Sequence, residues 1–227
     1  MTRTAIVTGS ASGIGAAVAA SLTRDGYTVA GLDISPDATY VVDVSDSAAV
    51  SETVARVTAD IGPIDAVVSV AGHYEMVPIS DITREQWHRM LRVHLGGLRN
   101  ITRSVLPSMI QRGTGSIIAI TSELAIGGGD GDAHYAAAKG AIIGLVRSLA
   151  VEVARHGVRV NAVAPGPTDT PLLAADSPWR AKEYLATVPN RRLTRPDEIA
   201  EVVRFLCSDD TDFCVGEVLS PNGGVVI

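Results

Sequence analysis

The sequence predicts an α/β fold, a single doubly wound domain of the Rossmann type built on a seven-stranded, mostly parallel sheet. Two observations carry this expectation. Short apolar segments alternate with longer segments whose hydrophobic residues have helical spacing. The short segments are apolar throughout, which is typical of strands buried on both faces of a parallel sheet. Strand–helix–strand repetition with right-handed crossovers then gives a doubly wound sheet.

The elements follow in order along the chain. Strands are predicted at residues 4–8, 28–33, 40–44, 66–70, 116–121, 158–164 and 217–220. Helices are predicted at residues 14–25, 48–61, 84–111, 133–156 and 196–207. We expect a bend before Pro107 in the long third helix, and Thr194 as the N-cap of the last one. Only nine residues separate Asp33 from Asp43, which predicts a loop there rather than a helix.

No linker divides the chain, so residues 1–227 are expected to form one domain. Residues 170–193 depart from the rhythm, because they contain three prolines and no strand pattern. Such a segment is either a lid over a site, possible pocket residues being Leu172, Leu173, Trp179 and Tyr184, or an ordered surface excursion.

Composition excludes several classes of function. Of the 227 residues, 46% are hydrophobic and 19% charged, which is ordinary globular usage. The net charge is −6 and the basic residues are scattered, which argues against a nucleic-acid partner. The two cysteines, Cys207 and Cys214, fit neither a disulfide scaffold nor a zinc site, and no metal is expected. No apolar stretch approaches the roughly 18 residues of a membrane span, and no export signal is found, so a cytoplasmic protein is expected.

A glycine-rich segment, Thr8–Gly15, joins the first strand to the first helix. Its spacing is G-x-x-x-G-x-G, and neither G-x-G-x-x-G nor a Walker loop. Glycines allow a close approach of the backbone, and a helix start offers free N–H groups, so the segment suits a pyrophosphate. The alternative is a glycine-rich turn without a ligand.

Asp33 ends the second strand, 18 residues after Gly15. A carboxylate there accepts hydrogen bonds from adenosine ribose hydroxyls and repels a 2′-phosphate. Neither Ser12 nor Ile34 supplies a compensating cation, so the sequence favours NAD over NADP. Asp43 and Val44, at the end of the third strand, offer a place for the adenine.

Ser122, Tyr135 and Lys139 form a second constellation. Tyr135 and Lys139 share one face of a helix, and Ser122 ends a strand 13 residues earlier. An ammonium beside a phenol favours the phenolate, so Lys139 is expected to lower the pKa of Tyr135. The tuned phenol then exchanges a proton with a carbinol or carbonyl oxygen that Ser122 binds.

With these motifs in order, the whole chain resembles the classical short-chain dehydrogenases/reductases. The family's TGxxxGxG is Thr8–Gly15, its YxxxK is Tyr135–Lys139, and its Pro-Gly after the sixth strand is Pro165-Gly166. The resemblance implies that Ser122, Tyr135, Lys139 and His94 are catalytic and that the cofactor is a nicotinamide dinucleotide, which Asp33 predicts to be NAD. The expected dinucleotide contacts are Gly9, Ser12, Gly13, Ile14, Gly15, Asp33, Asp43, Val44, Ala71, Gly72, Tyr135, Lys139, Pro165, Gly166, Thr168 and Thr170.

The resemblance also implies an activity and an assembly. The expected reaction interconverts a secondary alcohol and a ketone, like that of 3-oxoacyl reductases or of cyclic alcohol and dihydrodiol dehydrogenases. The expected partner is this small-molecule substrate, and the expected assembly is a homotetramer or homodimer formed through the helices at 84–111 and 133–156. The alternatives are a non-catalytic dinucleotide sensor or scaffold, and a lyase or isomerase that uses the cofactor only transiently.

Two departures from the family pattern affect the site. Val70 precedes Ala71-Gly72 where the family has Asn, so adenosine contacts differ. His94 stands where the family has an Asn that positions a water near the lysine. His94 either fills that role, and then adds a pH dependence, or is a packing residue. His134 is expected at a helix start on the surface, with the active-site rim as the alternative, and residues 127–131 as a glycine-rich loop over the substrate mouth or as filler.

Overall fold

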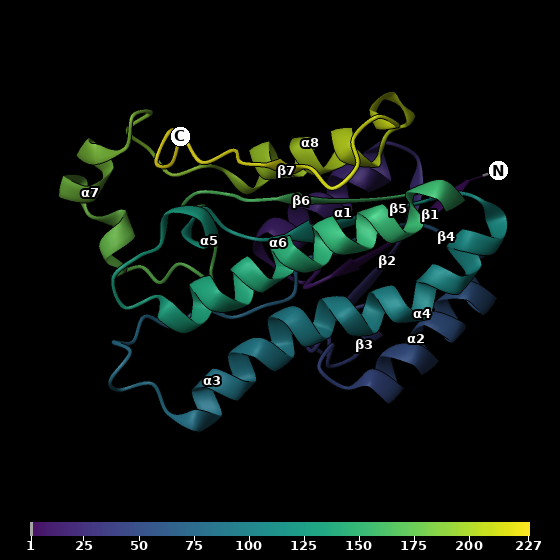
Figure 1. Cartoon of the computed structure of the whole chain (residues 1–227), viewed down its shortest axis with the longest axis horizontal. Helices are drawn as coiled ribbons and strands as arrows, with labels where there is room; N and C mark the ends of the chain where they lie inside the picture. The colour runs from purple at the N-terminus through teal and green to yellow at the C-terminus, as the bar shows by residue number, and fades with distance from the viewer. Residues whose placement is uncertain (1) are drawn as a thin grey trace.

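The computed structural model describes residues 2–227 and contains one seven-stranded sheet in the order β3-β2-β1-β4-β5-β6-β7 (Figure 1). The strands are β1 (Arg3–Thr8), β2 (Tyr27–Asp33), β3 (Tyr40–Val41), β4 (Ile64–Ser69), β5 (Gly115–Ile120), β6 (Val158–Val163) and β7 (Val218–Leu219). All six strand pairings are parallel, which confirms the predicted doubly wound sheet. β3 and β7 are each two residues long, shorter than predicted.

Helices cover both faces of the sheet. The long ones are α1 (Gly13–Arg24), α2 (Ser47–Asp60), α3 (Arg84–Leu91), α4 (Gly97–Arg112), α6 (Ala133–Val153) and α8 (Pro196–Cys207), and the short ones are α5 (Leu124–Gly127) and α7 (Lys182–Thr187). Alternate residues of β1 point to opposite faces, because a strand has a period of two. Ile6 packs into the cluster formed with α2, α4 and α6, whereas Ala5 and Val7 pack with α1 and α8.

The predicted helix at 84–111 is interrupted, and not at the proline. α3 and α4 are joined by a π-helical turn, η1 (Arg92–Gly96), which contains His94. Pro107 lies inside α4 without ending it. Pro107 is on the exposed face, where water can bind the carbonyl that loses its N–H partner. The predicted bend before Pro107 was therefore misplaced.

The predicted N-cap of α8 was also wrong. Thr194 forms a parallel bridge with Thr168, and its backbone N–H donates to the Pro167 carbonyl. The cap is Arg195, whose backbone N–H donates to Glu198 Oε2 at 2.8 Å. Thr194 thus pairs with the segment that follows β6. The side chain of Glu198, in the first turn of α8, caps the helix.

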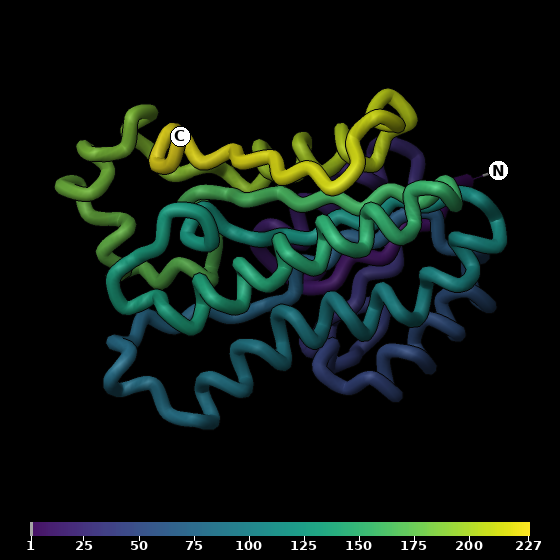
Figure 2. The backbone as a smooth tube through the Cα atoms, in the orientation of Figure 1, coloured from purple at the N-terminus to yellow at the C-terminus, as the bar shows by residue number. Residues whose placement is uncertain are grey.

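The carboxyl ends of the strands, and the loops that follow them, lie at one end of the molecule. Figure 2 shows residues 72–83, 128–132 and 170–193 extending together beyond this edge of the sheet. Residues 170–193, the lid segment, contain a 3₁₀ turn, η3 (Pro178–Arg180), and α7 instead of being structureless. The Val77 N–H donates to the Gly131 carbonyl at 2.8 Å, and this bond ties the first two loops together. The glycine-rich stretch begins inside α5 and continues as this loop.

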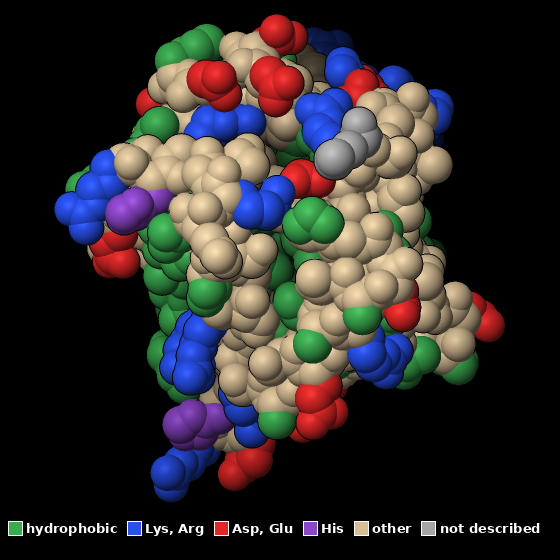
Figure 3. Space-filling model, turned by 90° about the vertical axis from the view of Figure 1, so that its right-hand side faces the viewer, with side chains coloured by type: hydrophobic (Ala, Val, Ile, Leu, Met, Phe, Trp, Pro, Cys, Tyr) green, Lys and Arg blue, Asp and Glu red, His purple; other side chains and the backbone are tan. Residues whose placement is uncertain are grey.

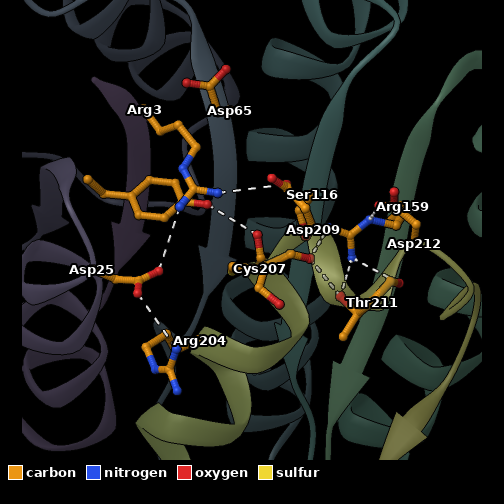
Figure 4. Close-up of polar contacts among 12 residues, drawn as sticks. Arg3, Asp25, Asp65, Ser116, Arg159, Arg204, Cys207, Asp209, Thr211 and Asp212 are labelled. Carbon is orange, nitrogen blue, oxygen red and sulfur yellow. Dashed lines mark hydrogen bonds and ion pairs between the residues drawn. The ribbon is translucent and has the colours of Figure 1, made fainter. Parts of the chain in front are cut away.

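At the opposite end of the molecule, acidic and basic side chains alternate on the surface (Figure 3). Arg3 lies between Asp25 and Asp209, and Arg159 points toward Thr211 and Asp212 at the end of α8 (Figure 4). These contacts hold the last helix against the amino ends of the strands. Within residues 2–227, every helix is too short or too polar to cross a lipid bilayer.

Candidate active site

A cleft of about 400 Å³ runs along the carboxyl ends of the strands. It brings together the four predicted catalytic residues and the predicted dinucleotide contacts. Its lining includes Gly9, Ser12, Gly13, Ile14, Gly15, Asp33, Asp43, Val44, Ala71, Gly72, His94, Ser122, Tyr135, Lys139, Pro165, Gly166, Thr168 and Thr170. The volume lies in the range of ligand sites, and the carboxyl edge of a parallel sheet is where such folds bind ligands.

The glycine loop fits a pyrophosphate by its geometry. Gly9 has a φ of +69°, and a Cβ there would lie 2.9 Å from Cα of Ala71. At Gly15, a Cβ would lie against the Gly9 carbonyl oxygen, so no side chain is tolerated. Ser12 caps α1 without a side-chain hydrogen bond, which leaves the first N–H groups of the helix available to an anion. The loop therefore has the close approach and the donors that a nicotinamide dinucleotide requires.

Asp33 lies at the end of β2, beside this loop. Its Oδ2 accepts from the Ala11 N–H at 3.0 Å, and its Oδ1 accepts from the Ser35 N–H at 3.0 Å. Each carboxylate oxygen keeps a lone pair for a ribose hydroxyl. The only Arg or Lys side chains among the cleft-lining residues are Arg89 and Lys139. Arg89 lies 3.6 Å from Glu75, and Lys139 bonds the end of β5.

Two hydrogen bonds join α6 to the end of β5. Thr121 Oγ1 donates to the Lys139 carbonyl at 2.8 Å, and Lys139 Nζ donates to the Ile120 carbonyl at 2.8 Å. These bonds join residues that are 18 and 19 positions apart in the sequence. They place Tyr135 and Lys139 beside Ser122. Burial lowers the pKa of Lys139 to about 7, because the ammonium loses its hydration.

The expected lowering of the Tyr135 pKa is not found. Burial raises the pKa of Tyr135 above its ordinary value, and the Glu123 carboxylate raises it further. The Ser122 hydroxyl opposes this shift without cancelling it. Lys139 Nζ lies 5.7 Å from the centroid of the Tyr135 ring and is directed to the Ile120 carbonyl. In this structure the desolvation of both groups therefore outweighs their attraction.

Ser122 bonds an acidic neighbour that the sequence prediction missed. Ser122 Oγ donates to Glu123 Oε2 at 2.9 Å and accepts from the Leu124 N–H at 3.2 Å. Glu123 is 5% exposed and lines the cleft. Burial raises the pKa of this carboxyl to about 7, although the bond from Ser122 opposes the shift. The signal in the sequence was a charged residue directly after a strand-end serine, in an otherwise apolar segment.

His94 is buried and faces Tyr135. The two rings meet edge to face with centroids 5.5 Å apart. His94 Nε2 lies 2.8 Å from the His73 carbonyl oxygen, to which it donates in the tautomer that is protonated at Nε2, and 3.2 Å from the His73 backbone nitrogen. Nδ1 has no partner within residues 2–227. Burial holds the pKa of His94 well below its usual value. The imidazole is therefore neutral at neutral pH, and a pH dependence of a relay through His94 is expected only below the ordinary titration range of histidine.

Gly72 shows how closely the loop after β4 approaches this ring. A Cβ at Gly72 would lie 2.3 Å from Cε1 of His94. Upstream, Thr8 Oγ1 accepts from the N–H groups of Val70 and Ala71 at 3.0 and 3.1 Å. These bonds fix the turn that separates the glycine loop from His94.

Two side-chain hydrogen bonds in series cross the mouth of the cleft. Trp179 Nε1 donates to Tyr74 Oη at 3.0 Å, and Tyr74 Oη donates to Asp132 Oδ1 at 2.7 Å. These two bonds connect the lid segment to the first residue before α6. Tyr74 and Asp132 were not predicted, because their proximity depends on loops 58 residues apart in the sequence. Trp179 both bonds Tyr74 and packs against Tyr184, with ring centroids 4.8 Å apart.

The prediction for His134 was wrong. The side chain is 1% exposed instead of lying at the surface, and it is not among the residues that line the cleft. Among residues 2–227, no group of three or more His, Cys, Asp or Glu side chains is placed to hold a metal ion.

The chain matches known proteins over nearly all its length. Residues 9–226 match a family model described as enoyl-(acyl carrier protein) reductase. A 3-oxoacyl-[acyl-carrier-protein] reductase of Thermotoga maritima is 35% identical, over 98% of this chain and 97% of the relative. An acetoacetyl-CoA reductase of Shinella zoogloeoides is 38% identical, over 99% and 98%. A cis-4-hydroxycyclohexanecarboxylate dehydrogenase of Sinomonas cyclohexanicum is 37% identical, over 98% and 96%.

A solved structure is also similar to this chain over nearly all its length. It is that of a protein from Beutenbergia cavernae assigned as an NAD(P)-dependent gluconate 5-dehydrogenase, with NADP bound at low occupancy. The two chains are 33% identical with a TM-score of 0.91, over 98% of this chain and 96% of the other. This chain belongs to the short-chain dehydrogenase/reductase family. It is an oxidoreductase of alcohols and ketones that binds a nicotinamide dinucleotide.

Proposed function

We propose that this enzyme interconverts a secondary alcohol and a ketone with NAD, and that Ser122, Tyr135, Lys139 and His94 carry the reaction. The observation that supports the proposal is the convergence of these four side chains in the cleft that also holds the glycine loop. The bound cofactor supplies the hydride chemistry, whereas the protein supplies position and proton transfer.

Tyr135 is the general acid and base of this proposal. Its raised pKa keeps the phenol protonated at neutral pH, so Tyr135 is ready to give a proton to a ketone oxygen. In the direction of alcohol oxidation the phenol must first lose this proton. Lys139, when protonated, lowers the cost of that loss, because an ammonium stabilises a nearby phenolate.

Ser122 and His94 hold the proton path on either side of Tyr135. Ser122 orients the substrate oxygen with its hydroxyl, which turns from Glu123 Oε2 to donate to that oxygen. His94 Nδ1 is buried, neutral and without a partner in the described chain, so it can accept a hydrogen bond from a water beside Lys139. In the family that this chain resembles, an Asn positions this water. Here the neutral imidazole of His94 takes that role.

NAD is the proposed cofactor, on the strength of Asp33. Its carboxylate would repel a 2′-phosphate, and the two Lys or Arg side chains of the cleft bond to other groups. The adenosine end is proposed to lie along Asp33, Asp43 and Val44, and the nicotinamide end beside Thr168 and Thr170. The solved relative holds NADP, so this preference is a property to be tested on this chain.

The substrate is proposed to be a small alcohol or ketone. This proposal is supported by the relative named for a cyclic hydroxy acid, whereas another relative is named for a 3-oxoacyl group on acyl carrier protein. We propose that residues 1–227 act as one domain in which the lid segment closes the substrate side. Arg180 supports this view, since its side chain donates to the carbonyls of Leu173 and Thr170 and pairs with Asp169 at 2.7 Å. Both cysteines are buried and unpaired, which suits the reducing cytoplasm.

A homotetramer or homodimer is the proposed assembly. On α6, Gly140, Gly144, Arg147 and Val151 follow one another at helical spacing on one face, and Val151 is 80% exposed. A Cβ at Gly140 or Gly144 would meet no other atom. This face can therefore pack closely against another helix.

Substitution Tyr135→Phe tests the proposed function. The variant should bind NADH normally but lose kcat/KM by ~10²–10⁴-fold, because only the proton transfer is removed. NADH fluorescence measures binding, and NADH oxidation with ethyl acetoacetate and with cyclohexanone measures turnover. Near-normal turnover by the variant contradicts the role of Tyr135. NADH binding by the wild type without turnover of any ketone would instead favour a dinucleotide sensor.

A further inference from the structure

The substrate side of the cleft contains a buried acidic group that the proposed reaction does not use. Glu123 has no Lys or Arg within ion-pair distance in residues 2–227, and Ser122 Oγ, at 2.9 Å, is its side-chain hydrogen-bond partner. A buried carboxylate is normally paired with a cation, because the lost hydration must be replaced. The backbone N–H groups of Glu123 and Leu124 also favour the charged form, yet no cation of the described chain balances the carboxylate, so a positive or hydrogen-bond-donating group on a ligand would stabilise it.

The titratable groups that face Glu123 are also acids. Asp132 and the phenols Tyr74, Tyr135 and Tyr184 all interact with it, from the loop before α3, from the start of α6 and from α7. Each of these phenols has a raised pKa, and the Glu123 charge contributes to the shift. Asp132 Oδ2 also has no partner in the described chain. The carboxyls of Glu123 and Asp132 thus share this wall with protonated phenols, and no Lys or Arg side chain of residues 2–227 pairs with either carboxyl.

The nearby cations are occupied elsewhere. Lys139 Nζ bonds the Ile120 carbonyl, Arg89 lies 3.6 Å from Glu75, and Arg180 pairs with Asp169. Aromatic rings complete the wall, with Trp179 set edge-on against Tyr184 and Tyr74 edge-on against Tyr135. Aromatic faces beside carboxylates favour ammonium and hydroxyl groups.

We propose that Glu123 is a specificity-determining residue, and that the substrate carries, in addition to the reacting carbinol, a hydrogen-bond-donating substituent, a hydroxyl or an ammonium, rather than a carboxylate. The inference rests on the proposed function, since it concerns the substrate of the same site. It separates this chain from the relative that acts on a hydroxycyclohexanecarboxylate. A donor on the substrate satisfies Glu123, whereas a carboxylate adds a further negative charge to the wall.

Three cyclohexanols that differ only at carbon 4 test this proposal. The substituents are carboxylate, hydroxymethyl and aminomethyl, and the measurement is kcat/KM for oxidation with NAD at pH 8. At this pH Glu123, with a pKa of about 7, is ionised. We expect the wild type to favour the aminomethyl and hydroxymethyl compounds over the carboxylate by ~10-fold or more, since like charges repel strongly in a desolvated site.

Glu123→Gln should reduce this preference to within about threefold, because the amide has the same shape and no charge. Glu152→Gln, at an exposed position on α6, is the matched control and should keep the wild-type ratio. Binding of NADH shows whether Glu123→Gln is folded. If that variant fails to fold, the wild type is compared at pH 6 and pH 8, where protonation of Glu123 should narrow the preference at the lower pH.

The proposal is overturned if the wild type prefers the carboxylate compound. It is also overturned if neither Glu123→Gln nor the change of pH alters the ratio of the kcat/KM values. Any compound that is not oxidised is measured as an inhibitor of ethyl acetoacetate reduction, with the same order expected. Failure of the aminomethyl and hydroxymethyl compounds to react or inhibit also overturns it. Failure to reduce any ketone at all would instead overturn the proposed function.

Discussion

At the scale of single residues, burial sets the protonation of the cleft. Lys139 is a base and Glu123 is an acid. Loss of hydration lowers the pKa of Lys139 and raises the pKa of Glu123, in each case to about 7. Each shift favours the neutral form, because neither group has a strong counter-charge. A small change in the local charge, such as a bound substrate, therefore changes their protonation near neutral pH.

The Glu123 carboxyl should make folding stability depend on pH. Its pKa rises from 4.5 to about 7 on folding, so its stabilising contribution is fully present below pH 4.5 and is lost as the pH rises through 7. Glu123→Gln should consequently be more stable than the wild type by about 3 kcal/mol at pH 8, and nearly equal to it at pH 4.5. Urea unfolding at both pH values measures the difference. An equal difference at the two pH values would show that the carboxyl does not titrate with folding.

Asp33 should control the choice of cofactor. Asp33→Ala removes the acceptor for the ribose hydroxyls and the repulsion of a 2′-phosphate. We expect the ratio of kcat/KM with NAD to kcat/KM with NADP to fall by ~10–100-fold, since hydrogen bonds to a charged group contribute about 1.5–3 kcal/mol. Asp33→Asn, which keeps one acceptor for the Ala11 or Ser35 N–H, separates cofactor effects from loss of the loop. A wild type that already prefers NADP would contradict the role of Asp33.

At the scale of elements, the two ends of the sheet have different tasks. The cleft lies at the carboxyl ends of the strands. At their amino ends, a network of hydrogen bonds and ion pairs holds the C-terminal end of α8 (Figure 4). Arg159, at the start of β6, donates to the Leu206 carbonyl at 2.8 Å and to the Ser208 carbonyl at 3.0 Å. These carbonyls belong to the last turn of α8 and the residue after it, so the guanidinium satisfies acceptors that the helix leaves unpaired.

Removal of this guanidinium should lower stability and spare catalysis. Arg159→Ala removes the charged hydrogen bonds to the Leu206 and Ser208 carbonyls and leaves them the neutral Thr211 hydroxyl, and we expect a loss of about 2–4 kcal/mol in the free energy of unfolding. Turnover at a temperature where the variant is folded should match the wild type. Glu52→Ala, at an exposed site on α2, is the control and should change stability by less than about 0.5 kcal/mol. Denaturant titration and initial rates measure both quantities.

The π-helical turn η1 is a further feature of this scale. It lies between α3 and α4 and contains His94, whose ring reaches Tyr135 and the His73 carbonyl. Such turns occur frequently at functional sites, because they change the direction of side chains within a helix. The periodicity of the sequence does not mark it, since hydrophobic spacing continues through residues 84–111.

At the scale of the whole molecule, the open face of α6 should be covered by a second copy. The proposed assembly predicts that sedimentation of the wild type shows a dimer or tetramer, and that Gly144→Arg shifts it toward smaller species. The reason is steric and electrostatic, since a charged side chain would fill the space in which two helices approach. Lys182→Ala, on exposed α7, is the control. A wild type that sediments as a monomer contradicts the assembly.

The sequence by itself determined the order of strands and helices, the carboxyl-edge cleft and the set Ser122, Tyr135 and Lys139. Hydrophobic periodicity and glycine spacing are local, and a parallel sheet brings its strand ends to one edge, so these features can be deduced without coordinates. Gly9, predicted as a cofactor contact from the glycine spacing, and Thr170, predicted from the family resemblance, line the same cleft.

Only the tertiary structure decided the electrostatics of the site and the identity of its outer wall. Desolvation depends on atoms from many segments, and it reversed the expected pKa shift of Tyr135. The contact of Tyr74 with Asp132 and Trp179 joins three loops. The position of the break at Arg92–Gly96 likewise depends on how the helix packs around His94. Local patterns do not report such long-range packing, because a residue's environment is fixed by neighbours distant in the chain.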